Sequence, residues 1–446
     1  MTTATPRRGV LGQVFLIVFI DMVGFSILFP LFPRMLEHYV GLEGAGSLVG
    51  RLDASLRELV GASAGSMAVP ALFGGILGSL YSLLQFACAP LWGQLSDRIG
   101  RRPTLLWTLA LTALGYLLWV VSGTFALLVI SRLVAGIAAG NISTASAVVA
   151  DTTSEGNRAR GMGVLGMGIG LGFVIGPAIG GLLSLHDLRQ SMSFPGVNPF
   201  SAPALVALAL ALVNFAWVLR GFDETLPPEK RGVGTEASQR GWSPFARLRR
   251  LGIAGVRRAN WAYFLFLTAF SAMEFTLTFL AAERFDYGPR QIMWMFVFIG
   301  LTLAFVQGGL VRRIVPRLGE KKVALFGLAV LLPGLVAVGL AATVAMLYLG
   351  LGLMAVGSAL AIPTLGSLVS RYAPSHAQGL VLGSFRSAGA LARAIGPVLG
   401  GVLFWLHGAK APYYAGAAFL LLPLLIASTL PDLPQTGDEP LPTPAD

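Results

Sequence analysis

Twelve long apolar runs, each bounded by charged or turn-forming residues, constrain this chain more than any other feature of its sequence. A helix needs about 20 apolar residues to cross a bilayer, and lipid does not tolerate a backbone whose polar groups are unpaired. We therefore predict an all-α membrane protein with twelve transmembrane helices. They are expected at residues 11–36, 70–92, 103–122, 125–149, 161–184, 200–220, 259–281, 290–311, 322–342, 345–369, 379–406 and 411–430.

The composition agrees with a membrane protein. Of the 446 residues, 55% are hydrophobic and 12% are charged, whereas soluble domains carry about 25% charged residues. Residues 323–370 include no charged side chain and are too many for one helix, so we divide them near 341–343.

Several other classes of protein are excluded by the sequence. A single cysteine, Cys88, excludes an internal disulfide framework and a cysteine-based zinc site. The four histidines are scattered and there is no G-x-x-x-x-G-K-[ST] loop, so we expect no metal site, no cofactor and no ATP-driven pump. We find no Ser–His–Asp set in the spans and do not expect an enzyme. In a membrane protein the net charge of +11 reflects loop topology, so no nucleic-acid partner is expected.

Lysine and arginine are distributed unevenly over the connections. Six lie in loops that follow odd-numbered spans, and 22 lie on the opposite side with the N-terminus. Cytoplasmic segments carry the excess of positive charge. We therefore predict a multi-pass protein of the cytoplasmic membrane with both termini in the cytoplasm.

The predicted spans divide into two groups of six. The N-terminal half covers residues 1–220, a basic cytoplasmic linker covers 221–258, and the C-terminal half covers 259–430. The proline-rich tail, 431–446, is predicted to be disordered and cytoplasmic. In the outer loop, 37–69, four leucines recur at helical spacing and predict a short helix on the outer membrane face. These leucines are Leu48, Leu52, Leu56 and Leu59.

An internal repeat relates the two halves. The segment Gly176–Gly181 reads G-P-A-I-G-G, and Gly396–Gly401 reads G-P-V-L-G-G, 220 residues later. A second echo pairs Gly100-Arg101-Arg102 with Gly319-Glu320-Lys321-Lys322. The repeat predicts two pseudo-symmetric six-helix bundles related by an axis along the membrane normal, which is typical of secondary transporters.

Two motifs then resemble the major facilitator superfamily. The loop between the second and third spans reads G-Q-L-S-D-R-I-G-R-R and fits the family pattern G-x-x-x-D-R-x-G-R-R. Its pattern residues are Gly93, Asp97, Arg98, Gly100, Arg101 and Arg102. The fifth span fits the G-x8-G-x3-G-P-x2-G-G pattern of drug–proton antiporters through Gly163, Gly172, Gly176, Pro177, Gly180 and Gly181. The second half repeats this pattern at Gly396, Pro397, Gly400 and Gly401.

The likeness is greatest to the tetracycline-transporter-like branch of the family, which includes animal organic-anion transporters. It covers stretches such as 73–102, 140–151, 224–231, 274–280 and 386–393. The resemblance implies the major facilitator fold and alternating access between the two halves.

For the two motifs, the resemblance implies specific roles. Asp97, with Arg98 and Arg102, is expected to close an inner gate by tethering the two halves, and the fifth span is expected to be a pliable interface helix. The residues alone also allow a solvated loop and ordinary packing of small side chains.

Four ionisable residues inside the spans bear on the mechanism. An Asp or Arg at the centre of a membrane helix costs about 2.5–3.5 kcal/mol, and such residues commonly mark a transport path. From a rise of about 1.5 Å per residue, Asp21 and Arg132 lie at nearly one depth, and so do Glu274 and Arg393. Each half therefore offers one acid and one base, for transport or as a structural ion pair. Asn141 is a further candidate for the substrate cavity.

The sequence predicts proton-coupled efflux of an amphipathic organic solute, with a proton gradient as the energy source and no cofactor. Glu274 is expected to be the main proton carrier, with Asp21 supporting it. Two alternatives stay open: an organic-anion transporter that uses Arg132 and Arg393 as ligands, and a non-transporting membrane receptor or lipid-handling protein. The expected partners are a small organic substrate, protons and the lipid bilayer, and the protein is expected to be a monomer.

Overall fold

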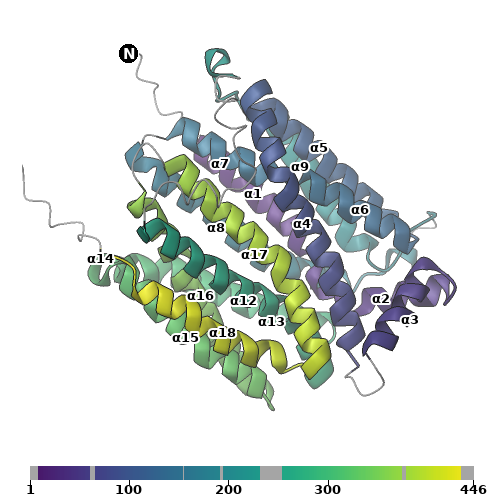
Figure 1. Cartoon of the computed structure of the whole chain (residues 1–446). Helices are drawn as coiled ribbons and strands as arrows, with labels where there is room; N and C mark the ends of the chain where they lie inside the picture. Colours follow the sequence, from purple (N-terminus) through teal and green to yellow (C-terminus); the bar gives the residue numbers. More distant parts are fainter. Residues whose placement is uncertain are drawn as a thin grey trace, which may run out of the picture.

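The computed structural model describes residues 9–60, 66–153, 155–190, 194–231, 254–373 and 378–432. Within these ranges the chain is helical and contains no β-strand. Twelve segments are long and apolar enough to cross a membrane (Figure 1). The predicted all-α membrane protein with twelve transmembrane helices is therefore confirmed. The predicted linker and tail lie largely outside the described residues.

The first half begins with a span built from α1 (Val10–Ser26), the 3-10 turn η1 (Phe29–Leu31) and α2 (Phe32–Glu43). Its other helices are α3 (Leu48–Val60), α4 (Ala68–Ile99), α5 (Arg101–Val120), α6 (Phe125–Ala138), α7 (Asn141–Thr152), α8 (Glu155–Leu183) and α9 (Ser201–Gly221). Two short 3-10 turns, η2 (Leu188–Gln190) and η3 (Pro228–Lys230), lie in the connections.

The second half begins with α12 (Ala254–Phe285). Its next span consists of α13 (Pro289–Phe305) and the π-helix η4 (Val306–Val311), which leads into α14 (Arg312–Leu318). The remaining helices are α15 (Glu320–Leu340), α16 (Val344–Tyr372), α17 (Gln378–His407) and α18 (Ala411–Ser428). The division predicted near residues 341–343 is thus confirmed.

The connection between the second and third spans differs from the prediction. Hydropathy ends the second span at residue 92 and leaves Gly93–Arg102 as a loop, but α4 continues to Ile99 and α5 begins at Arg101. Only Gly100 lies outside a helix, with a φ of 110° that favours glycine. Arg and Gln are good helix formers, so a charged segment can extend a membrane helix beyond its apolar part.

The fourth span is also interrupted where the sequence predicts one helix. It breaks at Ala139 and Gly140 into α6 and α7. A side chain at Gly140 would collide with the ring of Trp92. The Trp92 Nε1–H donates to the carbonyl oxygen of Ile137 at 2.6 Å, so a carbonyl group near the break keeps a partner.

The predicted short helix in the outer loop is present as α3. Its Val49 and Leu56 side chains are buried against the protein, whereas Leu48 and Leu59 are more than half exposed. The leucine spacing thus identified a helix whose apolar residues divide between the core and the surface.

Glycines set the pseudo-symmetry of the two halves. A Cβ atom at Gly180 would collide with the carbonyl oxygen of Ile27, the residue directly after α1, and one at Gly400 would lie 2.6 Å from the carbonyl oxygen of Ala272 on α12. Ile27 and Ala272 are 245 residues apart, which gives the offset between the first and seventh spans. The pair α8 and α1 in the first half therefore packs as α17 and α12 do in the second.

The adjacent glycines face the opposite half. Gly181 lies beside Met293 of α13, and Gly401 lies beside Leu72 of α4. Within the interface motif and its repeat, Gly180 and Gly400 therefore pack inside their own half, and Gly181 and Gly401 pack against the other half. Gly163 takes part in neither, since a Cβ atom there would meet nothing within 4 Å.

The two halves meet most closely on the side of the molecule that carries α3, here called the α3 side. The opposite side carries Gly93–Arg102 and is called the motif side. On the α3 side the Met67 N–H donates to Glu283 Oε2 at 3.1 Å, and the ring centroids of Phe32 and Phe275 are 5.9 Å apart. In Figure 1, α4 and α17 run close together near α3 and separate toward the motif side. The structure is thus closed on the α3 side.

The division of the glycine motif predicts unequal effects on stability. Gly180→Ala places a methyl group against the Ile27 backbone, and overpacking of this kind costs about 1–3 kcal/mol. Gly163→Ala is the matched control, because an open helical site gains about 0.5–1 kcal/mol from the same change. We expect Gly180→Ala to lower the melting temperature in detergent and Gly163→Ala to leave it unchanged or raise it. Equal melting temperatures would show that α1 and α8 are not held at this contact.

Candidate functional site

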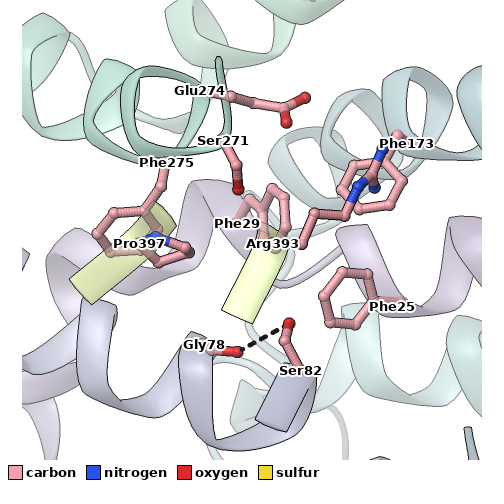
Figure 2. Close-up of a pocket in the computed structure, with 10 residues that line it drawn as sticks. All are labelled: Phe25, Phe29, Gly78, Ser82, Phe173, Ser271, Glu274, Phe275, Arg393 and Pro397. Carbon is pink, nitrogen blue, oxygen red and sulfur yellow. Dashed lines mark hydrogen bonds between the residues drawn. The ribbon is translucent and has the colours of Figure 1, made fainter. Parts of the chain in front are cut away.

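A cavity with an empty volume of about 340 Å³ lies between the two halves and is called the central cavity. Helices α1, α4 and α8 and the turn η1 form its first-half wall, and α12 and α17 form its second-half wall (Figure 2). The lining residues are Phe25, Phe29, Gly78, Ser82, Phe173, Ser271, Glu274, Phe275, Arg393 and Pro397. The structure thus brings Glu274 and Arg393 of the predicted site into one cavity.

The two walls of the central cavity differ in chemistry. On the first-half wall, the Phe173 ring meets Phe25 and Phe29 edge to face, with centroids 5.5 and 5.8 Å away. Of the ten lining residues, the two charged ones, Glu274 and Arg393, both belong to the second half. A solute in this cavity therefore contacts aromatic rings on one side and charged groups on the other.

Arg393 rests on an aromatic ring rather than on an acid. Its guanidinium carbon lies 3.8 Å from the centroid of the Phe173 ring, close enough for a strong cation–π contact (Figure 2). The charge of Arg393 acts on Glu274 through space. Among the described ion pairs, all with N···O distances within 4.0 Å, none joins the two residues.

The contact between Arg393 and Phe173 lies near the pseudo-two-fold axis. The two residues are 220 residues apart, which is the offset of the glycine repeat. Residues at equivalent positions can touch each other only near the axis that relates the halves. Arg386 and Gly166 have the same offset and also meet, since a Cβ atom on Gly166 would lie 3.4 Å from Arg386 Nη2.

The sequence offset between equivalent helices also identifies the first-half equivalent of Glu274. The offset of 245 between α1 and α12 pairs Glu274 with Phe29, which lines the same cavity. The second half therefore carries an acid and a base where the first half carries Phe29 and Phe173. Of the two expected acid–base sets, the one in the second half, Glu274 and Arg393, lines this cavity.

Asp21, Arg132 and Asn141 lie inside the first half and not among the lining residues of the central cavity. Arg132 is 2% exposed and its guanidinium carbon lies 4.7 Å from the Trp119 ring centroid. Asp21 is 5% exposed and neighbours Asn141, whose side-chain polar atoms have no hydrogen-bond partner. Asp21 Oδ2 and Arg132 Nη2 are also unpartnered, so the depth-matched ion pair predicted for this half does not form in the described structure.

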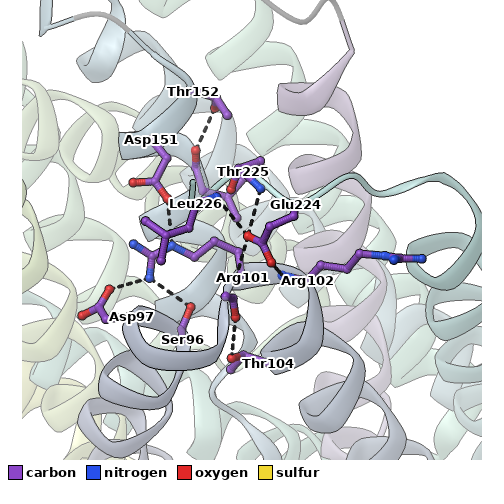
Figure 3. A network of polar contacts seen from close by, with 12 residues as sticks. Ser96, Asp97, Arg101, Arg102, Thr104, Asp151, Thr152, Glu224, Thr225 and Leu226 are labelled. Carbon is purple, nitrogen blue, oxygen red and sulfur yellow. Dashed lines mark hydrogen bonds and ion pairs between the residues drawn. The ribbon is translucent and has the colours of Figure 1, made fainter. Parts of the chain in front are cut away.

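The family motif on the motif side is organised by Arg101 (Figure 3). Its Nη1 lies 2.6 Å from Asp97 Oδ1, and its Nε lies 2.8 Å from Asp151 Oδ2. Nη1 also donates to Ser96 Oγ at 3.0 Å. Asp97 was expected to act with Arg98 and Arg102, but its ion-pair partner here is Arg101, while Arg98 is exposed.

A linker residue completes this network. Glu224 accepts from the backbone N–H groups of Arg101 at 2.9 Å and Arg102 at 3.2 Å. These groups open α5, where unpaired N–H donors and the helix dipole favour a carboxylate. The Arg102 side chain donates to the carbonyl oxygen of Leu219 at 2.7 Å. The motif residues thus join α4, α5, α7 and α9 within the first half.

The second half contains the same pair with its charges exchanged. Glu320 begins α15 as Arg101 begins α5, and Arg371 lies 220 residues after Asp151. Arg371 Nη1 lies 2.6 Å from Glu320 Oε2. The two halves therefore place an ion pair at equivalent positions, but the acid and the base are exchanged.

Sequence reasoning missed the aromatic wall and the acids around Arg101. Phe25, Phe29 and Phe173 read as ordinary apolar residues of their spans, and Asp151 and Glu224 as ordinary charged ends. A signal was available in the 220-residue offset, which maps Arg393 onto Phe173 and Asp151 onto Arg371.

Comparisons with known proteins agree with this geometry. The family model described as Major Facilitator Superfamily matches residues 14–318 and 313–445. Major facilitator superfamily domain-containing protein 10 of Bos taurus is 38% identical, over 95% of this chain and 93% of that protein. The class G tetracycline resistance protein of Vibrio anguillarum is 32% identical, over 88% of this chain and 95% of its own length.

Two solved structures are similar over nearly the whole chain. The crystal structure of the human organic anion transporter MFSD10 (TETRAN) has a TM-score of 0.77 and 35% identity, covering 95% of this chain and 100% of its own. A bacterial homologue of the lysosomal transporter Spinster, in an inward-facing and occupied conformation, has a TM-score of 0.62. At 13% identity, with 96% of this chain and 98% of its own covered, it supports the fold alone.

The network around Arg101 predicts a ranking of variants. Arg101→Gln leaves two carboxylates without their cation, and a hydrogen bond to a charged group contributes about 1.5–3 kcal/mol. The Asp97 side chain is 49% exposed, so Asp97→Asn should cost only about 0–1 kcal/mol. We expect the melting temperature in detergent to fall most for Arg101→Gln, slightly for Asp97→Asn and not for the exposed control Arg98→Gln. An equal fall for Asp97→Asn would place Asp97 at the centre of the network.

Proposed function

The chain belongs to the major facilitator superfamily, and we propose that it is a secondary active transporter that moves a small organic anion through the central cavity, coupled to protonation of Glu274. Its relatives and structural neighbours are multi-pass membrane transporters and not enzymes. Movement by alternating access needs two halves that rock about a central site, and the central cavity lies between such halves.

The observation that carries the proposal is the position of Arg393. Its guanidinium group faces the central cavity on a phenylalanine ring, with no carboxylate in bidentate contact among the described residues. A planar guanidinium binds carboxylates and sulfonates through two parallel hydrogen bonds. Arg386 lies two turns away on the same face of α17 and adds to the positive field. The name of the human relative as an organic anion transporter supports this reading.

Glu274 supplies a means of proton coupling. When it is ionised, its negative charge offsets the field of Arg393 and opposes an anion in the cavity. When it is protonated, that opposition ends and Arg393 acts on the substrate alone. Binding of the proton and binding of the anion therefore favour each other, so both are expected to cross in the same direction. Asp21, buried in the first half, is proposed to support the site and not to carry the proton.

The second candidate function is efflux of an amphipathic drug in exchange for protons. The aromatic wall formed by Phe25, Phe29 and Phe173 and the tetracycline resistance relatives favour it. For an uncharged or cationic solute, ionised Glu274 would favour binding and protonation would favour release. The sign of the pH dependence therefore distinguishes the two candidates.

We propose that the motif side is cytoplasmic, because it carries the excess of lysine and arginine. The protein would then lie in the cell membrane with both termini inside, and closure on the α3 side would make the present conformation inward-facing. Asp97 would contact the second half only after the motif side closes. The division into halves at 1–220 and 259–430 around a linker at 221–258, a monomeric state and a proton gradient without any cofactor belong to the same proposal.

Glu274→Gln tests the coupling, since it keeps the shape of the side chain and removes the titrating group. In proteoliposomes, uptake of a radiolabelled arenesulfonate by the unmodified protein should rise when the outside is acidified. Glu274→Gln should lose this pH dependence and keep the exchange of internal for external substrate, whereas Asp21→Asn should weaken both. If Glu274→Gln still accumulates substrate under a pH gradient, Asp21 and not Glu274 carries the proton. If the unmodified protein exports substrate toward the acidic side, the antiport candidate is favoured.

Arg393→Gln tests the anion ligand. Loss of one charge-assisted contact of about 1.5–3 kcal/mol corresponds to a rise in KM of about ten- to a hundredfold. Arg393→Lys keeps the positive charge but lacks the planar guanidinium group. Its KM should therefore lie between those of the unmodified protein and Arg393→Gln. The matched control is Arg98→Gln, which removes the same charge at an exposed position and should leave KM unchanged. An unaltered KM in Arg393→Gln would exclude Arg393 as the ligand.

The orientation can be tested by cysteine labelling in a Cys88→Ser background. Gly46 lies in an exposed turn on the α3 side, and Arg317 is exposed on the motif side. In right-side-out cells, a membrane-impermeant maleimide should label Gly46→Cys and should label Arg317→Cys only after permeabilisation. The reverse pattern would invert the orientation and make the present conformation outward-facing.

A further inference from the structure

A second cavity, with an empty volume of about 400 Å³, lies inside the second half and is called the side chamber. Its walls come from α12, α13 and α16, and it is closed toward the first half by Phe173 and Val174 of α8. Most of its lining is apolar, including Met273, Leu277, Phe296, Leu351, Met354 and Ala355.

The side chamber adjoins the central cavity. Glu274 and Phe173 line both volumes, so the two spaces share one boundary. Arg393 lies on the central-cavity side of that boundary, against the Phe173 ring. A molecule that reached across the boundary would have its charged end at Arg393 and its other end among apolar side chains.

Aromatic side chains lie at the equivalent place in the first half. Phe25, the equivalent of Phe270, stacks on Tyr81 with centroids 4.2 Å apart. This pair packs with Ala135, the equivalent of Met354, since Gly115 lies against Ala135 as Gly334 lies against Met354. The two halves therefore pack differently at this place.

We propose that the side chamber receives the apolar body of the transported anion, while Arg393 binds its charged group. This rests on the proposed function, because it assumes that the central cavity carries an organic anion. Burial of apolar surface contributes roughly 25 cal/mol per Å², so the side chamber favours anions with a bulky hydrocarbon part over small ones. Both binding groups belong to the second half, and the substrate stays with that half when the two halves rock.

Filling the side chamber tests the proposal. Ala355→Phe places a ring in it, and Leu349→Phe adds the same ring on the same helix at a position that is 63% exposed. The probes are radiolabelled naphthalene-2-sulfonate and ethanesulfonate, whose charge does not change with pH, taken up by proteoliposomes of the full chain. Identical elution and similar melting temperatures of the variants establish that they fold.

We expect Ala355→Phe to lower kcat/KM for naphthalene-2-sulfonate by about tenfold or more, as filling an apolar pocket does, and to leave ethanesulfonate within about twofold. Leu349→Phe should change neither. An unchanged preference for the larger anion in Ala355→Phe, or an equal fall for both anions in a folded variant, overturns the side chamber as the site. If the unmodified protein carries ethanesulfonate but not naphthalene-2-sulfonate, the side chamber is likewise excluded. If it carries neither, the proposed anion transport itself fails.

Discussion

Close approach of helix backbones at repeated glycines is the contact on which the rest of this molecule depends. Lipid offers no hydrophobic drive for helices to associate, so packing of small residues must hold them. Gly180 fixes α8 against α1 and Gly400 fixes α17 against α12. Those four helices carry most of the lining of the central cavity, including Phe25, Phe173 and Arg393. The register that the glycines impose therefore decides which side chains meet at the axis.

On this symmetric frame the chemistry is asymmetric. Each half provides equivalent backbone positions, but the second half places an acid and a base where the first places two phenylalanines. The first half keeps its own charged residues, Asp21 and Arg132, buried away from the central cavity. The charged groups of the cavity thus lie on one half and its aromatic rings largely on the other. The same backbone positions carry opposite charges in the pairs Arg101–Asp151 and Glu320–Arg371.

Much of the fold could be predicted from the sequence, because hydrophobic length and the glycine repeat are both local signals. Twelve spans, the helix in the outer loop and the pseudo-symmetry follow from them. Which charged residues contact each other could not be predicted from the sequence, because the helical rise gives the depth of a residue and not the direction of its side chain. Arg132 lies at the depth of Asp21 but is turned toward Trp119. Glu274 and Arg393 do reach one cavity, since both face the axis.

Helix ends were also hard to predict, for a related reason. Hydropathy reports where lipid contact stops, while hydrogen bonding decides where a helix stops. Ser96 and Asp97 remain helical because their side chains bind Arg101. Helix α4 therefore continues for seven residues beyond its apolar stretch. The break at Gly140 depends on Trp92, 48 positions earlier, and no local pattern contains that relation.

The hydrogen bond between Glu283 and the Met67 N–H has a consequence for how this protein can change over evolution. One partner is main chain, and every amino acid except proline supplies that donor. Mutational drift at position 67 therefore leaves the contact largely intact, whereas a change at position 283 can remove the side chain that accepts the hydrogen bond. A single codon can thus adjust how firmly the α3 side stays shut without altering any residue of the central cavity.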